Sequence, residues 1–214
     1  QGWGFARLSG AIGRNYASNG VVTRRKDGWA VGADVRINLP SLARGDAIFF
    51  AAAYSNGLID YVTGGNRANG SVAKDGRITG GWNVANANVT GTATCAVVAG
   101  PCALQTWKAW RAMVAFTHFW TPTLRSNFAV SYLKITPPSS ITNAAVGFPK
   151  SSAWQASGNL IWSPTRGFDI GLEVYYASIR HSTRSAAIAA TLAAAGVKKN
   201  PNDWAVKLRV QRTF

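Results

Sequence analysis

The chain has 214 residues and a net charge of +15, because 23 lysines and arginines face only 8 acidic residues. Its mean hydropathy is 0.00, and it contains no run of eighteen apolar residues, which excludes a transmembrane helix. A membrane protein without such a run must be a closed β-barrel, in which alternating strands average to a neutral hydropathy. The chain does not begin with Met and shows no signal peptide, so we expect a processed or partial chain.

The first half of the sequence predicts three strands. Residues 5–16 alternate weakly, with Ala6, Leu8, Gly10 and Ile12 on one side. A basic loop is expected at about 17–27, and clear alternation follows from Trp29 to Leu39. Pro and Gly bracket a short turn at 40–45, which leads to a strand through Tyr54 whose second side is not polar.

A long outer loop is expected at about 55–106, where Gly, Asn, Thr and Ala dominate. Parts of it, at 58–62 and 78–84, could extend the neighbouring strands. Cys95 and Cys102 lie in this loop around a Gly-Pro turn. Their spacing favours a local disulfide in an oxidising compartment over two free thiols.

Alternation returns at residue 107 and predicts five further strands. Short turns at 121–123 and 163–167 separate them, in alternation with outer loops expected at about 137–152 and 179–203. The last loop contains an Ala-rich, helix-prone stretch at 185–195. The final strand has the clearest pattern, with Trp204, Val206 and Leu208 on one side and Lys207 and Arg209 on the other.

Two features favour a membrane barrel over a soluble β-sandwich. Short and long connections alternate, and aromatic residues mark the strand ends, where rings suit the membrane interface. We therefore predict an all-β, antiparallel transmembrane β-barrel in which residues 1–214 form one segment of about eight strands. The predicted interface aromatics are Trp29, Trp120, Trp154, Trp162, Trp204 and Phe214.

The polar side of each strand would line a water-filled lumen, which needs polar and charged groups but no catalytic residue. The candidate pore-lining residues are Asp34, Arg36, Arg111, Asn127, Asn159, Asp169, Glu173, Lys207, Arg209 and Gln211. Because the cations among them outnumber the acids, we expect a mild anion preference. Asp169 and Glu173 are expected to face Lys207 and Arg209 as cross-strand pairs.

Three segments resemble the general porins of alphaproteobacteria: residues 28–40, residues 118–126, and the terminal residues 207–214. The resemblance implies an outer-membrane barrel of about sixteen strands. It also implies a homotrimer that lets small hydrophilic solutes diffuse, and a terminal Phe214 that the barrel-assembly machinery reads. This chain would be the C-terminal half, without the loop that narrows the pore. Its inward Gly, Ala and Ser residues would fill a small closed barrel poorly.

Partners and rival functions follow from the charges. Besides the lipid bilayer, lipopolysaccharide phosphates are expected to meet the loop cations, which could otherwise be solvated: Arg24, Arg25, Lys26, Arg180, Arg184, Lys198 and Lys199. No compact nucleic-acid-binding motif occurs. No metal or cofactor motif and no spaced carboxylate pair is present, and His118 looks like an interface residue rather than a base, so an enzyme is not expected. A small closed barrel with a structural, adhesive or enzymatic role remains the alternative.

Overall fold

The computed structural model describes residues 2–18, 23–63, 71–72, 78–79, 87–90, 103–136, 150–181 and 200–213. Eight long strands form one antiparallel sheet: β1 (Gly4–Ser18), β2 (Thr23–Asn38), β3 (Ala47–Asn56), β8 (Lys108–Thr121), β9 (Leu124–Thr136), β10 (Ser151–Thr165), β11 (Phe168–His181) and β12 (Asn202–Arg212). Each strand pairs with the next in this order, so that the sheet is a simple meander.

The remaining elements lie between β3 and β8 in the sequence. They are the helix α1 (Asp60–Thr63), the pair β4 (Ser71–Val72) and β5 (Ile78–Thr79), and the pair β6 (Ala87–Thr90) and β7 (Ala103–Thr106). Among the described residues, no helix is long and apolar enough to cross a membrane.

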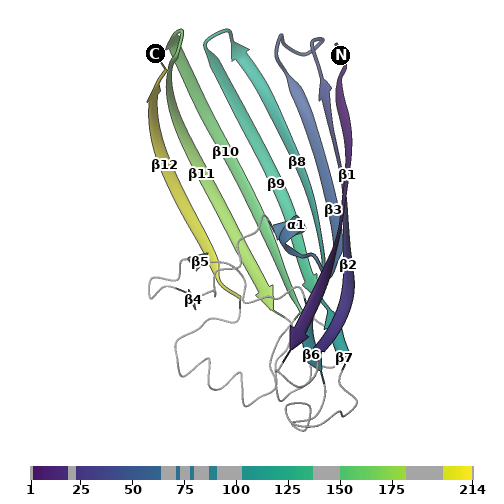
Figure 1. Ribbon diagram of the computed structural model, residues 1–214. Coiled ribbons are helices and arrows are strands. Elements are labelled where there is room, and N and C mark those ends of the chain that lie inside the picture. Colours follow the sequence, from purple (N-terminus) through teal and green to yellow (C-terminus); the bar gives the residue numbers. More distant parts are fainter. Residues whose placement is uncertain are drawn as a thin grey trace.

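The eight strands curve around one side of the sheet, and α1 lies within this curve (Figure 1). The short connections 39–46, 122–123 and 166–167 lie at one end of the strands, together with the two chain ends (Figure 1). We call this the turn end and the opposite end the loop end. Because short and long connections alternate, as expected from the sequence, all three tight turns lie at the turn end.

The sheet has two free edges. β1 pairs only with β2, and β12 pairs only with β11, within the described residues. The described sheet is thus open, which contradicts the alternative of a small closed barrel. In lipid, every backbone N–H and C=O needs a partner, so a lipid environment would require further strands at both edges.

Register divides the sheet into two faces, because directly opposite residues point to the same side. The apolar face comprises Ala6, Leu8, Gly10 and Ile12 of β1; Trp29, Val31, Ala33, Val35 and Ile37 of β2; Ile48, Phe50, Ala52 and Tyr54 of β3; Trp110, Ala112, Val114 and Phe116 of β8; Phe128, Val130 and Tyr132 of β9; Trp154, Ala156, Gly158, Leu160 and Trp162 of β10; Ile170, Leu172, Val174 and Tyr176 of β11; and Trp204, Val206, Leu208 and Val210 of β12. The opposite side is the polar face. The parity expected from the sequence is confirmed in every strand.

Most of the large side chains of the apolar face are exposed, and none of them is buried. Leu8 is 86% and Leu208 73% exposed, and Trp29, Trp154 and Trp204 are also exposed. An apolar surface of this extent is unusual on a monomer in water and marks an interaction with lipid or protein.

Several expected boundaries are wrong. Strands β1 and β2 occupy all but residues 19–22 of the loop expected at 17–27, because charged side chains are compatible with strands that project beyond an apolar band. β10 continues to Thr165, so that only Arg166 and Gly167 remain of the expected turn at 163–167. The stretch 58–62 is not a strand extension, because residues 60–62 belong to α1.

The outer loops expected at 55–106, 137–152 and 179–203 lie between strands, although their bounding strands reach further than expected. β10 begins at Ser151, β11 ends at His181 and β12 begins at Asn202. Cys95, Cys102, Phe214 and the Ala-rich stretch 185–195 lie outside the described residues.

Candidate channel wall

A belt of aromatic rings crosses the apolar face near the loop end. Neighbouring rings lie centroid to centroid at 5.2 Å for Trp29 and Tyr54, and at 4.9 Å for Trp110 and Tyr132. The belt continues from Tyr132 to Trp154 at 4.7 Å. Tyr176 and Trp204 lie 4.6 Å apart at its far side. Three of the predicted interface aromatics, on β2, β10 and β12, therefore belong to one belt.

A second group of aromatics marks the turn end. Trp120 and Trp162 are exposed there on β8 and β10, and the Trp120 Nε1–H donates a hydrogen bond of 2.9 Å to Ser126 Oγ. Trp154 and Trp162 are eight residues apart, which corresponds to roughly 27 Å along a strand. With a usual barrel tilt this approaches the apolar band of about 25 Å found in outer-membrane barrels. Five of the six predicted interface aromatics thus frame the apolar face.

All ten candidate pore-lining residues lie on the polar face. Two of them bond directly: Asn159 Oδ1 accepts hydrogen bonds from the Asn127 N–H at 3.1 Å and from its Nδ2 at 2.9 Å. Thr117 Oγ1 donates to Asn127 Oδ1 at 2.8 Å and extends this polar row to β8.

The expected cross-strand pairs are only partly right. Glu173 lies directly opposite Lys207, but Asp169 lies opposite Gln211. Asp169 forms its ion pair with Arg125 at 2.8 Å, while Ser163 Oγ donates to it at 2.6 Å. The β-bulge in β10 near Ser163 allows this contact to reach across from β9 to β11, which strand parity alone does not predict.

Two arginines of the polar face were absent from the candidate set. Arg125 follows the same alternation as Asn127, so strand parity could have identified it. Arg7 lies opposite Asp34 and pairs with it at 2.9 Å. The weak alternation of β1 gave no reason to single it out, although its parity was assigned correctly.

A buried carboxylate ties the first tight turn to β8. Asp46 is fully buried, and its Oδ2 lies 2.6 Å from His118 Nδ1, while its Oδ1 accepts the Phe119 N–H at 2.8 Å. His118 lies between the rings of Phe116 and Trp120. This arrangement anchors the turn, and the described residues contain no group of three or more His, Cys, Asp or Glu that could hold a metal ion.

The Asp46 contacts predict an acid-sensitive turn. Burial raises the pKa of Asp46, but the bonds from His118 and the Phe119 N–H outweigh it, and the pKa lies below its ordinary 3.8. The ionised carboxylate therefore stabilises the fold fully above that value, and the contribution is lost as pH falls through the lower folded pKa. Thermal unfolding in detergent micelles should show a fall in melting temperature below about pH 4 that is smaller in Asp46→Asn. Equal slopes in both proteins would contradict this role.

Comparison with solved structures finds a similar fold in an outer-membrane channel. The chain is similar to the outer membrane channel DcaP of Acinetobacter baumannii, with a TM-score of 0.60 and 16% sequence identity. The match covers all of this chain and 48% of the other, so the chain spans about half the length of that channel. No family model matches the chain. A search of curated proteins gave no significant match. The fold is therefore that of an outer-membrane channel, while membership of the alphaproteobacterial porins remains a prediction.

Proposed function

We propose that this chain forms part of the wall of an outer-membrane channel that lets small hydrophilic solutes diffuse. The observation that supports this most is the division of eight consecutive strands into a continuous apolar face framed by aromatics and a polar face rich in charge. Contact with lipid requires the apolar face, and a water-filled lumen requires the polar face.

The complete barrel in this proposal has about sixteen strands, of which this chain supplies half. The two open edges and the 48% coverage of the structural neighbour support this. In the assembled protein, the remaining strands would pair with β1 and β12. We further propose a homotrimer, with assembly through the C-terminal Phe214, and native electrophoresis of the intact protein tests the trimer.

Lipopolysaccharide is the proposed partner at the loop end. Lys108, Lys134 and Arg180 are exposed on the apolar side beyond the aromatic belt, where phosphates of an outer leaflet would lie. Arg25 is exposed on the same side, whereas Lys26 belongs to the polar face. Mass spectrometry of lipid that copurifies with the protein tests this contact.

Electrophysiology tests the channel and its charge preference together. Arg36 and Arg111 lie on the polar face and form no ion pair within the described residues. We therefore expect the reconstituted intact protein to conduct ions with a mild preference for anions. The double variant Arg36→Gln, Arg111→Gln should shift the reversal potential in a KCl gradient toward cations. The matched control is Arg14→Gln, because Arg14 lies on the apolar side and pairs with Asp27 at 2.7 Å. An unchanged potential in the double variant would contradict the preference, and an absence of current would contradict the channel.

An enzymatic role is not part of this proposal. The one close carboxylate–histidine pair of the described residues, Asp46 and His118, lies on the apolar side at the turn end, among aromatic rings. The other partner of the Asp46 carboxylate is the Phe119 N–H, and the Ser126 hydroxyl, which lies directly opposite His118, accepts the Trp120 Nε1–H. Liposome swelling with sugars, compared with a lipase assay on the same preparation, separates the two functions.

A further inference from the structure

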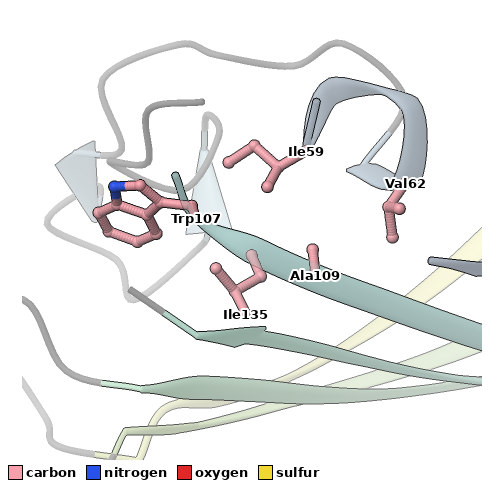
Figure 2. Close-up of a cluster of buried hydrophobic side chains, with 5 residues drawn as sticks. All are labelled: Ile59, Val62, Trp107, Ala109 and Ile135. Carbon is pink, nitrogen blue, oxygen red and sulfur yellow. The ribbon is translucent and has the colours of Figure 1, made fainter. Parts of the chain in front are cut away.

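The chain that follows β3 crosses the polar face of the sheet. Ile59 and Val62 of this segment are buried and form a hydrophobic cluster with Trp107, Ala109 and Ile135 (Figure 2). Ala109 and Ile135 are direct partners on the polar face of β8 and β9. The cluster is therefore an apolar patch on the polar face, and residues of this segment cover it.

Two glycines make room for the same segment. Gly13 and Gly28 are directly opposite on the polar face of β1 and β2. A Cβ on Gly28 would lie 2.8 Å from the Gly57 carbonyl oxygen, and a Cβ on Gly13 would lie 3.0 Å from Leu58 Cδ2. Both strands thus lack side chains where the segment lies against them. The approach of Gly28 to the Gly57 backbone needs glycine, whereas a Cβ at Gly13 would need only a small shift of the Leu58 side chain.

Hydrogen bonds hold the start of the segment in place. Asn15 Nδ2 donates to the Gly57 carbonyl at 2.9 Å, and the Gly57 N–H donates to the Trp107 carbonyl at 2.8 Å. The segment is thereby fixed to β1 on one side and to the start of β8 on the other. A segment anchored in this way is a permanent part of the wall.

We infer that residues 57–63 form a fixed constriction that limits the size of the solutes passing this half of the pore. The inference rests on the proposed channel function. Val62 is fully buried against the wall, whereas Tyr61 is 38% exposed. The segment thus leaves its phenol exposed, while its apolar side chains Ile59 and Val62 are buried against the wall. The porin resemblance placed the narrowing loop outside this chain, and this segment adds a second narrowing within it.

Thiol labelling tests whether Tyr61 faces the ion path. In intact protein with Cys95 and Cys102 replaced by serine, a bulky, charged methanethiosulfonate should reduce the single-channel current of Tyr61→Cys by roughly a third. The control is Val31→Cys, because Val31 is exposed on the apolar face, where labelling should leave the current unchanged. A labelled Tyr61→Cys channel with full current would overturn the inference.

A second experiment releases residues 57–63 from the wall. Val62→Asp places a charge in a fully buried apolar site and should free the segment, raising conductance by about 1.5-fold and favouring larger sugars most in liposome swelling. Ile161→Asp is the control, since Ile161 lies on the polar face but outside the cluster. A folded Val62→Asp channel with the conductance and sugar dependence of the parent would overturn the inference and leave the channel function intact. A parent protein that inserts without conducting would overturn both.

Discussion

Val114→Arg is expected to destabilise the folded protein in lipid vesicles by about 2–4 kcal/mol, the cost of an arginine near the middle of a bilayer. Val114 is exposed on the apolar face, midway between the Trp110 and Trp120 rings of β8, and is directly opposite Phe50 and Val130. Because the face is continuous there, the guanidinium finds no acceptor and must displace lipid contact. Urea unfolding in vesicles, followed by tryptophan fluorescence, measures the loss.

Met113→Arg is the matched control. Met113 is the preceding residue and lies on the polar face opposite Ala51 and Ser131. There an arginine meets water in the proposed lumen, so we expect the free energy of unfolding to change by less than about 1 kcal/mol. Equal destabilisation by both substitutions would show that the two faces do not differ in environment, and the membrane reading would fail.

Gly45→Ala should be the most damaging small substitution in the tight turn before β3, with a loss of about 1–3 kcal/mol. Gly45 has a φ of +104°, which an L-residue rarely adopts, and an added Cβ would lie 2.8 Å from Phe119 Cε2. Movement of that ring also disturbs the adjacent Phe119 N–H, which donates to the buried Asp46 carboxylate. The strain and the lost anchor therefore act on the same turn.

Gly10→Ala isolates this effect. Gly10 lies in β1 without a positive φ, and the nearest atom to an added Cβ is the Ala30 carbonyl oxygen at 3.7 Å, an ordinary contact. Its stability should stay unchanged or rise slightly, since alanine loses less backbone entropy than glycine in a strand. Thermal unfolding of both variants in micelles, with the heat-induced shift in gel mobility as a second readout, compares them. A Gly45→Ala melting temperature equal to that of Gly10→Ala would contradict the argument from strain.

Strand parity gave the sequence its predictive strength. A side chain in a strand points to one of two sides, so the alternation from Trp29 to Leu39 determined the face of each residue without any knowledge of its partners. Directly opposite residues of antiparallel neighbours point to the same side, which is why the candidate pore-lining residues, from Asp34 to Gln211, lie on one side.

Contacts that depend on register or on a bend in the chain could not be predicted from the sequence. The Arg125–Asp169 pair spans β9 to β11 and depends on a bulge in β10. The Asp46–His118 contact joins residues 72 positions apart, and neither residue carries a local pattern that reveals the other. Residues 58–62 were expected to extend a strand, and no pattern in them indicated the helix α1.

The amino-acid sequence by itself therefore determined which side chains lie on the apolar face and which on the polar face, because that choice follows from alternation along each strand. Only the tertiary structure decided that the sheet remains open at β1 and β12, and that residues after β3 lie across its polar face. Both depend on what lies opposite in space: a strand edge needs a partner, and the Gly13–Gly28 pair admits the segment only because β1 and β2 are in register.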